Sequence, residues 1–202
     1  MQEQTNTQEL KDRLELIENM LSAGRRKTES WGWVFVLWGV AYYIAIAWSS
    51  WGNSLRLFSH LAWPVTMLTA CLLTMVIAFS RKRNEPETTM GRAIGSIWFS
   101  VGISMLLLFP SLSMAHKLDQ QSFVALIAVM LAIANGASGM ILKWRAQIGC
   151  SVVWWITSVA AVFCSVAQVT ILFLATLTVC QIGFGIYAMT RESKRRHEAV
   201  HA

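Results

Sequence analysis

Two uncharged amide side chains inside long apolar runs are the first residues of this chain that could do chemistry. Asn135 and Gln181 each lie deep in such a run. Together they could orient a polar group of a ligand. In a structural role they would instead form hydrogen bonds between helices, worth about 0.6–2 kcal/mol each in membrane proteins. The sequence leaves both roles open, and we favour the structural one.

Aromatic side chains are the second candidate. Some lie deeper in the apolar runs than the membrane interface where Trp and Tyr usually collect, among them Trp38, Tyr42, Trp154 and Trp155. Aromatic faces attract organic cations, so these rings could form a cage for one. Because no carboxylate accompanies them, we expect them to pack against helices or lipid.

The acidic residues are informative by their position. All 11 of them lie outside the apolar runs, whereas proton relays and cation sites in membranes normally use buried carboxylates. This argues against a proton-coupled antiporter and against metal transport. His60 and His116 have no further ligand residues nearby, and the four cysteines show no CxxC spacing.

Catalytic signatures are also missing from the sequence. It contains no nucleophile elbow, no HExxH motif, no phosphate loop and no dinucleotide fingerprint. We therefore expect a protein that is not an enzyme and that binds neither a cofactor nor a metal ion.

The elements that would position these side chains are membrane helices. Apolar residues make up 55% of the 202 residues and charged residues only 14%, and about 20 apolar residues suffice to cross a bilayer. The fold class predicted is an all-α integral membrane protein. Its six transmembrane helices cover about residues 31–51, 57–80, 93–113, 122–142, 147–165 and 168–190.

Three regions follow from this division: an amphipathic helix over residues 1–29, the transmembrane domain over 30–190 and a basic tail over 191–202. Asp119 or Ser122 can cap the fourth membrane helix, and Pro110 should bend or end the third. The charge-free stretch 146–190 is too long for one span, so we expect a turn at about residues 165–168.

Small residues mark the faces where helices could approach closely. Gly32 and Gly39 lie seven residues apart in the first membrane helix. Gly95 and Gly102 repeat that spacing in the third, which would fit an internal repeat of hairpins. In the fourth, the small residues are Ala125, Ala128, Ala132, Gly136 and Gly139.

The basic residues set the predicted orientation. With six spans, 15 of the 17 Lys and Arg residues fall on one side and only Arg56 and Lys117 on the other. By the positive-inside rule, both termini are cytoplasmic and the spans form three hairpins. The net charge of +6 then serves contact with anionic lipid headgroups, and we expect no binding of nucleic acid.

The N-terminal helix carries an apolar face. Leu10, Leu14, Ile17 and Leu21 follow one another at spacings of four, three and four residues, which places them on one side of a helix. Such a face could lie in the membrane interface or pair with another helix, from a partner or a second copy. The acidic residues of this segment favour pairing.

The segment Leu10–Gly39, LKDRLELIENMLSAGRRKTESWGWVFVLWG, resembles uncharacterised bacterial multi-pass inner-membrane proteins. In these proteins a polar amphipathic helix leads through a Gly- and Trp-rich junction into several short-looped spans. The resemblance implies a place in the bacterial inner (plasma) membrane, and it assigns no functional residues.

Two functions remain as expectations. The first is a non-catalytic membrane protein that acts through a protein partner docked on its N-terminal helix. The alternative is a permease for a small molecule or lipid, or the membrane subunit of a transporter. In that case Asn135, Gln181 and the deep aromatic residues would line its path.

Overall fold

The computed structural model describes residues 2–51, 58, 61–82 and 89–201, and this part of the chain is helical with no strand. The predicted start of the second membrane helix at residue 57 lies outside the described residues, as does His60. The elements in chain order are α1 (Gln2–Ser30), α2 (Gly32–Trp51), α3 (Ala62–Lys82), α4 (Thr89–Met114), α5 (Gln120–Ile141), α6 (Arg145–Phe163), α7 (Val166–Leu177), the π-helix η2 (Thr178–Gly183) and α8 (Phe184–His201).

Six helical stretches of the described chain are long and apolar enough to cross a membrane. They are Gln8–Trp51, Ala62–Ser80, Thr89–Met114, Gln120–Ile141, Arg145–Phe163 and Val166–Glu198. The prediction of an all-α protein with six such helices is confirmed, and the chain has the features of a multi-pass membrane protein. The last stretch is continuous through α7, η2 and α8.

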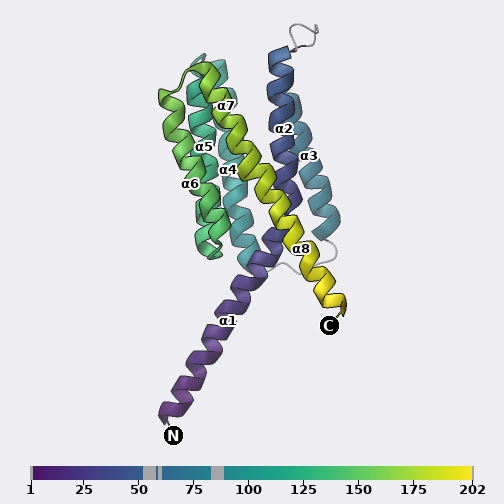
Figure 1. Cartoon of the computed structure of the whole chain (residues 1–202), viewed down its shortest axis with the longest axis vertical. Helices are drawn as coiled ribbons and strands as arrows, with labels where there is room; N and C mark the ends of the chain where they lie inside the picture. The colour runs from purple at the N-terminus through teal and green to yellow at the C-terminus, as the bar shows by residue number, and fades with distance from the viewer. Residues whose placement is uncertain (1, 52–57, 59–60, 83–88, 202) are drawn as a thin grey trace.

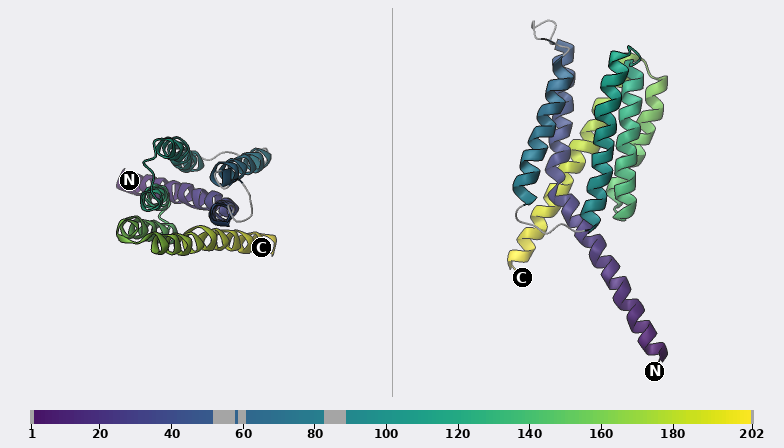
Figure 2. Two further views of the ribbon diagram at one scale, coloured as in Figure 1. Left: turned by 90° about the horizontal axis from the view of Figure 1, so that it is seen from above. Right: turned by 180° about the vertical axis from the view of Figure 1, so that it is seen from behind.

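The helices pack as a bundle from which α1 projects (Figure 1). α5 and α6 form the most extensive pair, α2 packs on α3, and α4 packs on α5. The long α7–η2–α8 stretch runs diagonally across the bundle and meets α2, and both chain termini lie at the same end (Figures 1 and 2).

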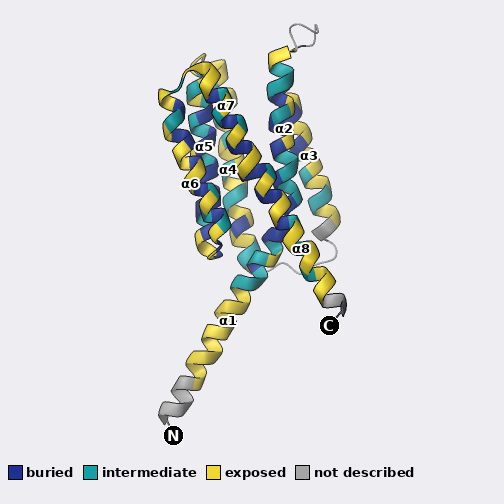
Figure 3. Cartoon of the chain, viewed as in Figure 1, coloured by how far each residue is buried: buried dark blue, intermediate teal, exposed yellow. Residues whose placement is uncertain are grey.

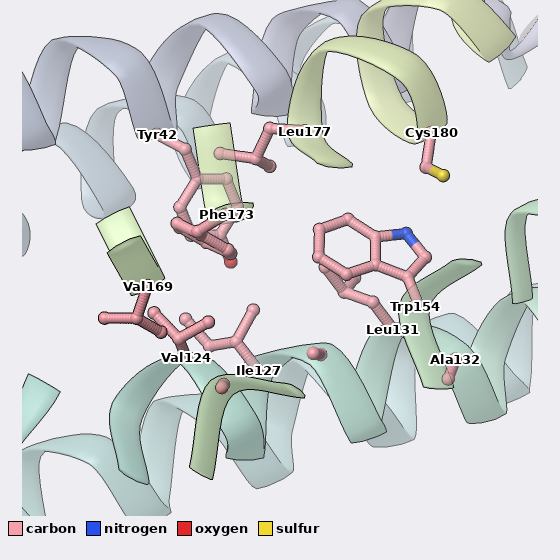
Figure 4. Packing of buried hydrophobic residues seen from close by; sticks show 12 residues of the cluster. Tyr42, Val124, Ile127, Leu131, Ala132, Trp154, Val169, Phe173, Leu177 and Cys180 are labelled. Atoms are coloured by element: carbon pink, nitrogen blue, oxygen red, sulfur yellow. The ribbon is translucent and has the colours of Figure 1, made fainter. Parts of the chain in front are cut away.

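Two clusters of buried side chains form the core. One joins α2, α5, α6 and α7, with Tyr42, Ile127, Trp154 and Phe173 among its members (Figure 4). The other lies nearer the termini and includes Phe35, Ile94, Leu142, Trp144 and Phe184. Outside these clusters many large apolar side chains stay exposed along α3, α4 and α6 (Figure 3), as expected where lipid is the solvent.

The small residues of α5 allow α6 to approach closely. Ser151 Oγ donates to the Ala132 carbonyl at 2.8 Å, and Ser158 Oγ donates to the Ala125 carbonyl at 3.0 Å. A Cβ added at Gly139 would lie 2.9 Å from the Ile148 backbone nitrogen. The predicted close packing of this face is confirmed, and its partner is α6.

Glycine also brings α2 against α8. A Cβ on Gly32 would lie 2.8 Å from the Gly185 carbonyl oxygen, and one on Gly39 would lie 2.8 Å from the Ile182 side chain. The predicted close approach at the glycine face of α2 is confirmed. On α4, by contrast, a Cβ at Gly95 or Gly102 would meet nothing within 4 Å.

The helix ends follow local sequence signals. Asp119 caps α5, because its side chain accepts from the Ser122 backbone N–H at 3.2 Å. The predicted turn near residue 165 is confirmed: the Gln168 side chain accepts from the Ser165 N–H at 2.9 Å as α7 begins. Pro110 does not end α4, which continues to Met114.

Candidate functional site

The apolar face of α1 is open along most of its length. We call Leu10, Leu14, Ile17 and Leu21 the α1 seam; the first three are exposed and Leu21 is half-buried. α1 extends past the ends of the neighbouring helices on the side of the chain termini, with its outer part exposed and its base covered (Figures 1 and 3). The seam is therefore available for a contact that the described residues of this chain do not supply.

The base of α1 is held firmly against the bundle. A Cβ added at Gly24 would lie 2.7 Å from the Leu142 side chain and 2.8 Å from that of Met90. Arg25 Nε donates to the Leu142 carbonyl at 2.6 Å, and its Nη2 donates to the Lys143 carbonyl at 3.2 Å. These carbonyls end α5 and lack helical partners, so Arg25 both caps α5 and anchors α1.

A buried ion pair makes a second anchor at this base. Glu29 is only 5% exposed, and its carboxylate accepts from the Arg195 guanidinium of α8. The ion pair joins the two ends of the chain. Sequence reasoning missed both anchors because it counted Arg25 and Arg195 only as orientation signals. The available hint was that Glu29 is the one acid between Glu18 and Trp51.

The seam and the anchored base share one face of α1. Leu14, Leu21 and Thr28 follow at intervals of seven residues, which is close to two helical turns. Thr28 is buried, and Gly24 of the same face packs on Leu142. The seam therefore points toward the turn between α5 and α6, residues 142–144, which we call the α5–α6 turn.

Several polar side chains of α5, α6 and η2 are buried inside the bundle. Asn135 Nδ2 donates to the Leu131 carbonyl of its own helix at 2.8 Å, while its Oδ1 has no hydrogen-bond partner in the described chain. The same holds for Gln181 Oε1 and Ser138 Oγ. No hydrogen bond within the described residues joins Asn135 to Gln181, so the two amides form no direct link there.

Gln147 is the buried polar residue that sequence reasoning missed. It is fully buried in the first turn of α6, and neither atom of its side-chain amide has a hydrogen-bond partner in the described chain. Its position two residues after Arg145 is typical of a solvated helix end. The available signal was its spacing: it precedes Ser151 by four residues and Trp154 by seven, so all three share a helix face.

The π-helix η2 places Gln181 and Cys180 beside α2 and α6. Cys180 Sγ lies 3.8 Å from the Cys150 carbonyl of α6, and a Cβ on Gly39 of α2 would lie 3.3 Å from Gln181 Cβ. At its start, the Tyr43 hydroxyl lies 2.6 Å from Thr178 Oγ1. Short π-helices interrupt the regular i−4 hydrogen bonds and often mark functional sites.

Three of the four predicted aromatic residues lie at one core cluster, which contains Tyr42 and Trp154 and packs against Trp38. The rings of Tyr42 and Trp154 both meet Phe173, at centroid distances of 5.9 and 6.1 Å (Figure 4). Trp38 is half-buried and donates to Thr74 of α3 at 3.2 Å, whereas Trp155 is exposed. The four rings therefore do not enclose a common space.

Other binding features are few in the part of the chain that is described. It contains no group of three His, Cys, Asp or Glu residues that could hold a metal ion. A hollow of about 440 Å³ opens at the N-terminal end of α5, and neither Asn135 nor Gln147 lines it. Its lining residues are Asp119, Gln121, Ser122, Ala125, Leu126 and Val162.

Comparisons with known proteins extend this description no further. No protein-family model, no curated protein and no solved structure matches the chain.

Proposed function

We propose that this chain is a non-catalytic, multi-pass membrane protein that acts by docking a protein partner on α1. The observation that carries the proposal is an exposed apolar seam on a helix whose base is anchored by Arg25 and Glu29. Such anchoring holds the seam away from the bundle in one orientation. A rigid apolar helix face is a common recognition element for a second helix.

The proposal includes an orientation in the bacterial inner membrane. Both termini are cytoplasmic, the six spans form three hairpins, and the basic residues meet anionic headgroups. The side preference of Lys and Arg and the common end of the two termini (Figure 1) support it. A cysteine placed at His201 should resist a membrane-impermeant thiol reagent in intact cells and react after lysis.

Native mass spectrometry of the protein, extracted in mild detergent from its own membrane, tests the function. We expect a protein partner in fixed stoichiometry, lost when Leu14 and Ile17 are both replaced by Asp. Leu16→Asp is the matched control, because Leu16 is 59% exposed against 57% for Leu14 but lies about 200° around the helix from it. A partner that survives the Leu14→Asp and Ile17→Asp changes would overturn the proposal.

The buried amide side chains favour a second candidate function. It is a permease for a small molecule or lipid, or the membrane subunit of a transporter. Buried polar atoms without partners cost about 1–3 kcal/mol each, and Asn135, Gln147 and Gln181 all carry such atoms. A ligand or water that met them would recover that free energy.

Thiol labelling distinguishes the two candidates. Cys180 directly precedes Gln181, and Cys150 follows Gln147 by three residues on the same helix. A ligand bound at the buried amides should therefore slow the reaction of both thiols with a membrane-permeant thiol reagent. Cys71 on α3 is the internal control. Unchanged labelling across a panel of small molecules and lipids would remove the permease from consideration.

A further inference from the structure

We infer that the α1 seam binds an acidic amphipathic helix of a separate cytoplasmic protein, with one end of that helix against the α5–α6 turn. This inference rests on the proposed function and names the kind of partner it requires. Three observations carry it: the direction of the seam, the obstacle at its base, and the charges along its edges.

The seam leads directly into the α5–α6 turn. Gly24, on the same face as the seam, already packs against Leu142, and Arg25 beside it donates to the carbonyls of Leu142 and Lys143. A helix lying along Leu10, Leu14 and Ile17 would therefore meet this turn end-on. The contact has room for a helix that ends there and none for one that continues into the bundle.

This obstacle excludes α1 of a second copy as the occupant. All copies of a membrane protein insert with the same orientation, so a second α1 would run parallel to the first. Paired along the seam in a common register, its residues 24–30 would need the space that Leu142 and Trp144 of the first copy fill. The transmembrane bundle of the second copy would also have to lie on the far side of Leu142 and Trp144 of the first.

The charges around the seam select an acidic partner. Lys11 and Arg13 flank the seam on its two sides, about 80° from its centre, whereas Glu9, Asp12 and Glu15 lie farther round the helix. Within residues 9–21, Glu18 is the one acid at the edge. Arg13 pairs with Glu9 at the exposed surface, where such a pair is weak and exchanges readily.

The α5–α6 turn and the first turns of α4 close one end of this docking surface, and we call them its end wall. The end wall is basic as well. Lys143 and Arg145 are exposed on either side of the buried Trp144, and Arg92 is exposed in the first turns of α4, which also contacts the base of α1. A helix that ends here would gain most from carboxylates on its terminal turn. Complementary charge of this kind decides between partners and speeds association.

Site-specific photo-crosslinking in the full-length protein, in its own membrane, provides the test. A photoreactive phenylalanine derivative placed at Leu14 should give an adduct with a second protein, and the same probe at Leu16 should give none. Mass spectrometry should map the adduct to a helix with apolar residues three and four apart and an acidic end.

Charge reversal at the end wall sharpens the test. Lys143→Glu with Arg145→Glu should lower the adduct yield at position 14 about tenfold, since each change turns attraction into repulsion. Lys117→Glu, at the opposite end of the bundle, should leave the yield unchanged. Arg145→Glu alone serves if the double variant folds poorly, because an acid in the first turn of α6 suits the helix dipole.

The outcomes separate this inference from the proposed function. An adduct of twice the chain's own mass, an adduct with lipid, or a yield indifferent to the charge reversal would overturn the acidic helix as occupant. Only loss of the seam's role, with binding unaffected by Leu14→Asp and Ile17→Asp, would overturn the docking function itself.

Discussion

Two membrane helices of this protein carry glycines at the same seven-residue spacing, with opposite results. On α2, Gly32 and Gly39 lie against α8 and η2 so closely that a single added methyl group would collide with a backbone oxygen or a side chain. On α4, Gly95 and Gly102 are exposed, with nothing within 4 Å of either position. The spacing alone therefore does not predict a contact.

The difference lies in the helix that each pair meets. α2 crosses α8 where Gly185 removes the opposing side chain, so two backbones approach each other. α4 contacts α5 and the base of α1 through other faces, and Ile94 is its one buried residue. Interfaces between membrane helices are enriched in small residues, but Gly95 and Gly102 lie on a face of α4 that no other helix of the described chain approaches.

The largest difference in stability is expected when one glycine of each pair is replaced by a bulky residue. Gly32→Leu should lower the free energy of unfolding by about 3 kcal/mol, because the side chain must push two backbones apart. Gly102→Leu, the matched change on α4, should instead stabilise by up to about 1 kcal/mol, because Leu meets no obstacle there and loses less conformational entropy than Gly in a helix. Unfolding in mixed detergent micelles measures both, and equal effects would contradict the assigned α2–α8 crossing.

A single methyl group should give effects of opposite sign on α5 and α6. Gly139→Ala should destabilise by about 1–3 kcal/mol, since its Cβ would lie 2.9 Å from the Ile148 nitrogen. Gly149→Ala meets nothing within 4 Å and should stabilise by about 0.5–1 kcal/mol, because Ala loses less conformational entropy than Gly in a helix. The same unfolding titration checks the two signs.

Two arginines extend the comparison to α1. Arg25→Ala removes two hydrogen bonds to carbonyls that end α5 and should cost about 1–2 kcal/mol. Arg13→Ala removes only an exposed pair with Glu9 and should cost about 0.5 kcal/mol or less. Unfolding titrations of the two variants side by side measure this, and a larger loss at Arg13 would contradict the anchoring role of Arg25.

The smallest effect is expected at the exposed cap of α5. The hydrogen bond from Ser122 lowers the pKa of the Asp119 carboxyl below its ordinary value of 3.8. Because the folded-state pKa is lowered, the stabilisation is present at neutral pH and is lost as the pH falls through that lowered pKa. An Asp119→Asn variant should lack this acid dependence, which a comparison of unfolding midpoints at pH 7 and pH 3 would detect.

Local signals in the sequence predicted much of this fold, and distant contacts set its limits. The Asp119 cap, the turn at Ser165 and the small-residue face of α5 each depend on neighbours within a few residues or on a helical repeat. Glu29 and Gln147 could not be placed this way. The surroundings of Glu29 are made by α8, 166 residues away along the chain, and those of Gln147 depend on how closely α5 packs on α6.

For the candidate site too, the features set by local sequence were predictable and those set by distant contacts were not. The α1 seam is a repeat within one helix, so its existence was predictable from Leu10 to Leu21. Its direction was not, because Arg25 and Gly24 fix it through contacts with Leu142, 117 residues from Arg25 along the chain. The sequence identified both buried amides. That Asn135 and Gln181 do not bond to each other follows only from how the helices pack.

The ion pair between Glu29 and Arg195 gives the molecule a mechanical property. α1 is about 43 Å long at 1.5 Å per residue, and it would pivot where Gly32 crosses Gly185. A rotation of about 5° there would carry the tip through about 4 Å on such an arm. A force applied by a bound protein at Leu10 would thus reach α8 and the π-helix within the membrane as a smaller displacement and a larger force.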